Sequence, residues 1–169
     1  MYQNKYWREL DQLKVHVYYL EKYLEKTVKI ERNINIFLAF TSNSSVAGWI
    51  IWKDCSMTWA TIIAISQAVN AVKGSLPYSK RLKALQGITN DLESLFLAME
   101  NDWFNVSEGK LTEEEIHKLH MRYKEKRRQL IQKYLGASPL PEHSLMLEKA
   151  KESARAYFNN FMYFKEYKQ

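Results

Sequence analysis

The sequence predicts an all-α protein, in which a two-helix transmembrane hairpin is joined to a cytoplasmic helical bundle built from N- and C-terminal amphipathic helices. Three observations lead to this prediction. The 169 residues include only 5 glycines and 3 prolines, too few for a loop-rich or disordered chain. Apolar residues make up 46% of the chain, enough to form a core. Charged residues make up 26%, yet two adjacent stretches contain none.

Residues 1–32 are predicted to form an amphipathic helix. Its apolar side chains recur at alternating steps of three and four residues: Tyr6, Leu10, Leu13, Val17, Leu20 and Leu24. This spacing places them on one face of a helix. The face is expected to pack against the other amphipathic helices of the bundle.

Residues 33–76 are predicted to form the transmembrane hairpin. The stretch 33–52 has 20 residues without a charge, and 55–72 has another 18, with only Lys53 and Asp54 between them. A helix that crosses a bilayer needs about 20 residues with few or no charges. The turn is therefore expected near residues 53–56.

The distribution of basic residues predicts the orientation of the hairpin. The turn carries one basic residue, Lys53. Nine basic residues lie within about 20 residues of the other ends of the two stretches, the excess that marks cytoplasmic flanks: Lys14, Lys22, Lys26, Lys29, Arg32, Lys73, Lys80, Arg81 and Lys83. We therefore expect an inner-membrane protein in contact with the lipid bilayer, with both termini in the cytoplasm and Cys55 outside.

Both uncharged stretches are polar for membrane helices, which leaves open the alternative of a soluble bundle with a buried hairpin. Polar groups in hydrocarbon are costly unless they are paired or face water. The candidate pore-lining residues are Asn35, Ser42 and Ser45 in the first stretch and Ser66, Gln67 and Asn70 in the second. Hydrogen bonding between the two helices is the alternative role for the same side chains.

Residues 77–169 are predicted to form a helical domain. Apolar residues from Leu82 to Trp103 recur at helical spacing. Thr112 followed by Glu115 is typical of a capping box at a helix N-terminus, and Gly136 is expected to end that helix. A last helix follows Pro139 and Pro141.

No catalytic motif is found in the sequence. There is no glycine-rich phosphate loop, nucleophile elbow or carboxylate pair. The single cysteine excludes an internal disulfide. His117 and His120 share a helix face with Glu113, but their spacing does not match a zinc motif, and a solvated face is favoured. The sequence predicts neither an enzyme nor a cofactor or metal site.

Positive charge is concentrated in residues 110–136, which carry eight basic and four acidic residues. The candidate residues for an anionic ligand are Arg122, Lys126, Arg127 and Arg128. In a symmetric oligomer, several copies of such a helix would attract a nucleotide or short oligonucleotide. A solvated surface, or contact with anionic lipid headgroups, is the alternative.

The order of these segments extends over essentially the whole chain. An amphipathic helix precedes the hairpin, a long helical segment then leads to Leu-Thr-Glu-Glu-Glu-Ile at 111–116, and a last helix follows Pro139 and Pro141. This layout resembles the SLATT domain family, although no motif transfers residue by residue. The resemblance implies a bacterial membrane effector that forms pores in anti-phage defence. Similarity to the effector of Hailong-type defence further implies a nucleotidyltransferase partner.

Three functions are compatible with the sequence. The favoured one is a homo-oligomeric ion channel, with a tetramer as the preferred number of copies. Several copies are needed because two spans per chain cannot enclose a lumen. Its gate would respond to a nucleotide or oligonucleotide made by the partner nucleotidyltransferase. The first alternative is a non-conducting membrane anchor that recruits a cytoplasmic partner. The weaker alternative is a soluble helical nucleic-acid-binding protein.

Overall fold

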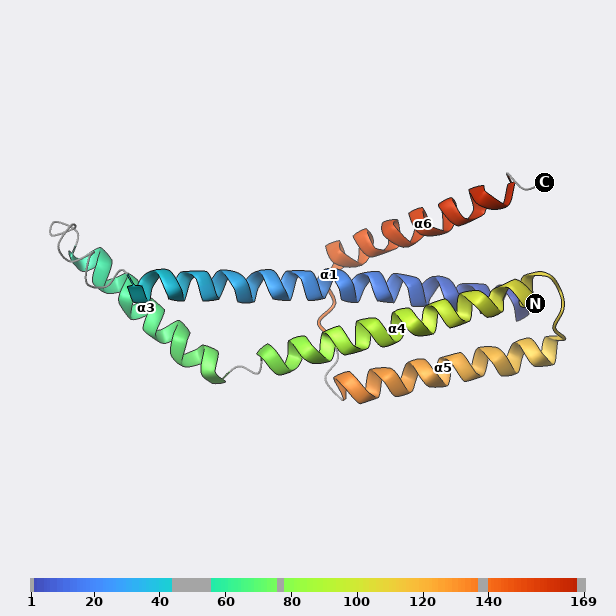
Figure 1. The fold of residues 1–169 in the computed structure, drawn as a ribbon, viewed down its shortest axis with the longest axis horizontal. Helices are drawn as coiled ribbons and strands as arrows, with labels where there is room; N and C mark the ends of the chain where they lie inside the picture. The colour runs from blue at the N-terminus through green and yellow to red at the C-terminus, as the bar shows by residue number, and fades with distance from the viewer. Residues whose placement is uncertain (1, 44–55, 76–77, 137–139, 167–169) are drawn as a thin grey trace. The chain divides into compact units, whose positions relative to one another are not determined.

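The computed structural model describes residues 2–43, 56–75, 78–136 and 140–166, with side chains described for 2–41, 57–73, 81–136 and 140–160. Within these residues the protein is all-α, as predicted, and has no strand. Five helices are present (Figure 1): α1 (Tyr2–Asn43), α3 (Ser56–Ser75), α4 (Tyr78–Ser107), α5 (Glu113–Leu135) and α6 (Ser144–Glu166).

The chain forms two compact units. The four-helix unit comprises Met1–Leu24 and Lys83–Gln169, and the hairpin unit comprises Glu25–Leu82. The long helix α1 contributes its first part to the four-helix unit and its last part to the hairpin unit. Each unit is described by itself below.

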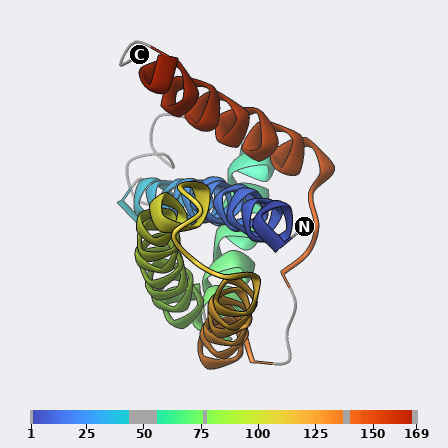
Figure 2. The same cartoon turned by 90° about the vertical axis from the view of Figure 1, so that its right-hand side faces the viewer.

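In the four-helix unit, α1 lies between α6 on one side and the α4–α5 pair on the other (Figure 2). The predicted apolar stripe of α1 is buried from Tyr6 to Leu20, and Leu24 packs at its edge. The facing stripe of α4 includes Leu85, Leu92 and Phe96. These helices thus bury the faces that their apolar spacing predicts.

Specific polar contacts tie α1 to its neighbours. The Tyr6 hydroxyl donates to the Met99 carbonyl of α4 at 2.9 Å. Lys14 is buried and donates to Glu93 at 3.0 Å. Its ammonium also lies 4.2 Å from the Phe96 ring centre and 4.4 Å from that of Tyr157 in α6. A cation held over two rings and beside a carboxylate is electrostatically compensated despite its burial.

The ends of α5 confirm the predicted caps. The Thr112 hydroxyl accepts the N–H of Glu115, and the Glu115 carboxylate accepts the N–H of Thr112 at 2.8 Å. This is the reciprocal pairing of a capping box. At the other end, the N–H of Gly136 donates to the Gln132 carbonyl, and Gly136 has φ 58°, a conformation that glycine adopts without steric cost.

The predicted membrane hairpin requires a correction. In the part of the chain that the structure describes, no helix combines the length and apolar character needed to cross a membrane. Residues 33–43, the described part of the first uncharged stretch, belong to α1, which is charged along most of its length. In α3, polar residues such as Gln67, Asn70 and Lys73 interrupt the apolar sequence. The predicted inner-membrane location, with both termini in the cytoplasm, was wrong. Cys55, predicted to lie outside, is not among the described residues.

Candidate functional site

The hairpin unit places one face of α3 against α1. Among the described side chains of α3, only Ser66 is buried. The partly buried residues recur at helical spacing around it, as expected for one contact face: Trp59, Ile62, Ile63, Val69 and Lys73. This inward face of α3 closes a cleft with α1.

The cleft between α1 and α3 gathers most of the polar residues singled out in the sequence. It has a volume of about 390 Å³. Asn35 lines it from α1, and Ser66, Gln67 and Asn70 line it from α3. The Ser42 side chain and all of Ser45 lie outside the described residues. Four of the six predicted residues therefore share one cleft within a single chain.

A hydrogen bond across the cleft joins the two helices. Lys73 Nζ donates to Asn35 Oδ1 across it. Ser66 donates to the Ile63 carbonyl of its own helix at 2.8 Å, and Gln67 and Asn70 stay exposed. The Lys73–Asn35 contact is the kind of bond that interhelical pairing requires.

The opposite side of α3 is apolar and exposed. Met57 is 82% exposed, Ile65 52% and Val72 54%. No charged residue occurs from Ser56 to Val72. Exposed alanines and Thr61 fill the rest of this outward face. An exposed apolar surface of this extent marks an interaction site more often than a solvated one.

The four basic residues predicted to bind an anion have different partners. Arg122 lies 3.4 Å from Asp102 of α4, Arg127 binds Glu9 of α1 at 2.8 Å, and Arg128 binds Glu125 of its own helix at 2.7 Å. Lys126 is exposed and has no ion pair among the described residues. Arg127 and Arg128 line one groove of about 340 Å³ together with Lys124 and Glu9, but Arg122 and Lys126 do not line it.

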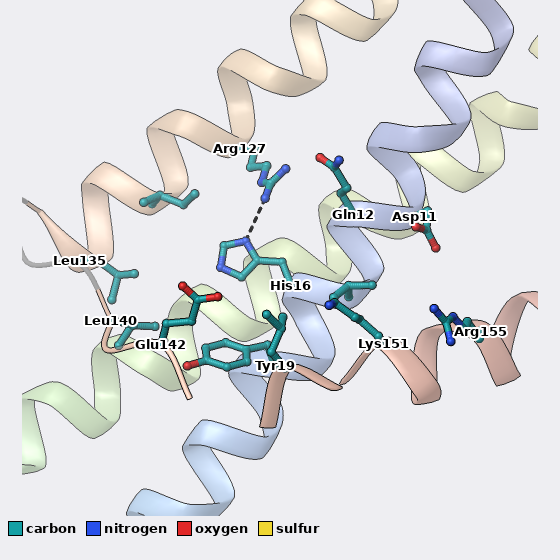
Figure 3. A pocket seen from close by; sticks show the side chains of 13 residues that line it. Asp11, Gln12, His16, Tyr19, Arg127, Leu135, Leu140, Glu142, Lys151 and Arg155 are labelled. Atoms are coloured by element: carbon teal, nitrogen blue, oxygen red, sulfur yellow. Dashed lines mark hydrogen bonds between the residues drawn. The ribbon is translucent and has the colours of Figure 1, made fainter. Parts of the chain in front are cut away.

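Arg127 instead organises a polar contact between α1 and α5. Its second terminal nitrogen lies 3.1 Å from His16 Nδ1 (Figure 3). Arginine can only donate, so Nδ1 must accept, and the neutral ring carries its proton on Nε2. Burial and the nearby Arg127 charge lower the pKa of His16 to about 4. Sequence spacing gave no indication of this contact, because the two residues are 111 positions apart.

Glu9 completes the contact from the α1 side. Its second carboxylate oxygen lies 3.7 Å from His120 Nε2, too far for a hydrogen bond. That buried nitrogen has no hydrogen-bond partner within the described structure. Burial is the main cause that lowers the pKa of His120, while Glu9 acts in the opposite direction.

The comparisons with known proteins leave the family open. No protein-family model, curated protein or solved structure matches this chain. The SLATT resemblance, the role in anti-phage defence and the nucleotidyltransferase partner therefore stay predictions. The predicted pore, which requires membrane-spanning helices, also stays a prediction.

Proposed function

We propose that this protein is a homo-oligomeric assembly protein, whose copies associate through the outward face of α3. The observation that carries the proposal is the contrast between the two sides of that helix. One side covers α1, while the other exposes Met57, Ile65 and Val72 in a stretch from Ser56 to Val72 that contains no charged residue. Burial of such apolar side chains favours association by about 25 cal/mol per Å².

A second copy fits this face because the face can pair with itself. If two α3 helices cross antiparallel around a two-fold axis level with Ser66, Ala64 of each lies opposite Ala68 of the other. Thr61 then lies opposite Ala71. Such a two-fold contact uses the same patch on both subunits, and it brings no like charges together.

The size of α3 sets the expected strength of one contact. A helix of 20 residues is about 30 Å long. One helix–helix contact of that length covers less than the roughly 800 Å² per partner found in standard interfaces. A dimer held by α3 alone is therefore expected to dissociate on dilution. A tetramer, the predicted number, requires additional surface such as Ile36 and Phe40 of α1, which are 60% and 65% exposed.

Binding of a nucleotide or short oligonucleotide by α5 is the second candidate function. Its support is that Lys124 and Lys126 are both exposed and have no ion pair among the described residues. After its first turn, α5 carries seven basic residues and only Glu125 as an acid. Oligomerisation would multiply this charge, and binding would weaken steeply as salt rises.

Sedimentation equilibrium over a wide range of protein concentration tests the assembly. The expected result is a mass above the 20.1 kDa of one chain that falls on dilution. Ala68→Glu should shift the protein to monomer, because a carboxylate opposite Ala64 of the other copy would be buried in the contact without a partner. Asn33→Glu is the matched control, since it adds the same charge at an exposed polar position of the hairpin unit.

Two results would reject the assembly function. The first is a wild-type protein that stays monomeric at every concentration. The second is an Ala68→Glu variant that assembles as the wild type does. Ala68 is exposed, so circular dichroism should show the same helix content in both variants and in the wild type.

A further inference from the structure

A groove in the four-helix unit lies beside the contact between His16 and Arg127. It has a volume of about 670 Å³ and is formed by α1, α5, α6 and the segment before α6. That volume falls within the range of small-molecule sites. Figure 3 shows side chains from these elements surrounding the groove.

The walls of the groove are mainly aliphatic. Five aliphatic side chains line it: Val15, Ile131, Leu135, Leu140 and Leu147. Tyr19 also lines the groove; its hydroxyl donates to the Pro141 carbonyl at 2.7 Å and accepts the N–H of His143 at 3.2 Å. Those bonds hold Tyr19 in place. An aliphatic chain suits these walls better than a flat aromatic ring.

Charges are unevenly placed around the groove. In Figure 3, Leu135, Leu140 and Glu142 lie toward one end, and Lys151 and Arg155 toward the other. Asp11 also lines the groove. The lining residues at the α6 end, two cations and one carboxylate, are therefore net positive, whereas Glu142 at the other end would repel an anion.

The cations of α6 are available to a ligand. Arg155 is exposed and has no ion pair within the part of the chain that the structure describes. Lys151 pairs with Glu148 at 2.8 Å, but both side chains are exposed, and such pairs are weak. Arg127 is already bound to Glu9, and the Nε2–H of His16 is a further donor at the groove. A carboxylate could bind Lys151 and Arg155 without breaking a buried pair.

We infer that this groove binds an aliphatic carboxylate, with the hydrocarbon chain against Leu135, Leu140 and Leu147 and the carboxylate beside Lys151 and Arg155. Charge complementarity at the α6 end and the aliphatic walls together select this class of ligand. The site lies within one four-helix unit, so it does not depend on the proposed assembly.

Calorimetric titration with three ligands of equal chain length tests the inference. The probes are octanoate, 1-octanol and octylammonium, which differ only in the head group. Octanoate should bind with one molecule per chain and about tenfold more tightly than octanol, as charge-assisted hydrogen bonds require. Octylammonium should bind most weakly.

Variants assign the binding to the groove. The double variant Lys151→Gln and Arg155→Gln should lose about tenfold in octanoate affinity while its octanol affinity stays the same. Leu147→Ser should weaken both ligands. Lys118→Gln is the matched control, because it removes an exposed, paired cation of α5 that does not line the groove.

The inference is overturned if octanoate fails to bind, or if it binds no better than octanol. It is also overturned if the double variant binds octanoate as the wild type does. Ala68→Glu, which should abolish assembly, is expected to leave octanoate binding unchanged. Loss of binding in that variant would place the ligand at the exposed apolar face of the hairpin unit and reject the groove.

Discussion

The long helix α1 has two parts that differ in packing. In the four-helix unit, its residues bury a continuous apolar stripe that includes Tyr6, Leu13 and Leu20. In the hairpin unit, the described side chains of α1 include one buried residue, Thr41, while Ile36 and Phe40 are exposed. The same helix is thus covered in one unit and largely uncovered in the other. A continuous helical backbone does not require that every apolar residue find a partner within the chain.

The polar residues of the two units differ in a parallel way. In the four-helix unit, side chains far apart in sequence pair across helices, as Lys14 does with Glu93 and Tyr134 with Asp91. In the hairpin unit, Lys73 pairs with Asn35 across the two helices, whereas Thr41, Thr61 and Ser66 bond to carbonyls of their own helix. Hydrogen bonds between residues far apart in the sequence therefore hold the helices of the four-helix unit together. The hairpin unit leaves the outward face of α3 exposed.

The largest expected effect is a difference between the two units in the stability that is lost when an apolar side chain is truncated. Phe96→Ala should lower the free energy of unfolding by about 3–5 kcal/mol, because Phe96 is fully buried among α1, α4 and α6. Ile65→Ala, at a half-exposed position of α3, should cost well under 1 kcal/mol in the monomer. Urea unfolding at low protein concentration measures both. Equal losses would remove the distinction between the units.

The next effect is a pH dependence located in the four-helix unit. The pKa of His16 is about 4 in the folded protein and about 6.5 when unfolded. Between these values the unfolded state binds a proton that the folded state does not, so stability should fall as the pH decreases from about 6.5 to 4. The loss should approach about 2–3 kcal/mol. His16→Gln should flatten this part of the profile, and an unchanged slope would contradict the assignment.

A smaller effect is expected from a close approach between α4 and α5. A Cβ atom at Gly87 would lie 2.5 Å from the Tyr134 ring. That ring is held by a 2.8 Å hydrogen bond from its hydroxyl to Asp91. Gly87→Ala should therefore cost about 1–3 kcal/mol, despite the higher helix propensity of alanine. If Gly87→Ala raises the urea midpoint, the two helices are not in this contact.

The smallest of these effects concerns the start of α5. Thr112→Ala removes the hydroxyl that accepts the N–H of Glu115 and should cost about 1 kcal/mol. Thr112→Asp, which keeps an acceptor, should retain most of the stability. Thermal unfolding of the two variants provides the comparison, and identical midpoints would argue against the capping box.

The sequence predicted features that depend on neighbouring residues. The α1 stripe, the Thr112 cap and the Gly136 terminus follow from local spacing and backbone preference, and the structure confirms them. The absence of charge in 33–52 and 55–72 suggested spans, but charge is only one part of apolar character. The polar side chains of α3, in the second of these stretches, already indicated that the stretch is less apolar than its lack of charge suggests.

Long-range contacts could not be predicted in this way. The His16–Arg127 contact joins residues 111 positions apart. The contacts of Lys14 in α1 are with residues of α4 and α6. Neither leaves a periodic pattern in the sequence. The groove beside His16 was missed for the same reason, because its residues come from separated segments. The grouping of Asn35 with Ser66, Gln67 and Asn70 was easier to anticipate, since a hairpin brings its two helices together.

Amide hydrogen exchange at two protein concentrations tests the central claim most directly. The claim is that the four-helix unit is complete within one chain, while the outward face of α3 is covered by another copy. Exchange in the core of α4, around Leu92, should be independent of concentration. Amides of α3 between Met57 and Val72 should become more protected as the concentration rises, and Ala68→Glu should abolish that gain. Protection of α3 that is the same in dilute and concentrated samples would contradict the account.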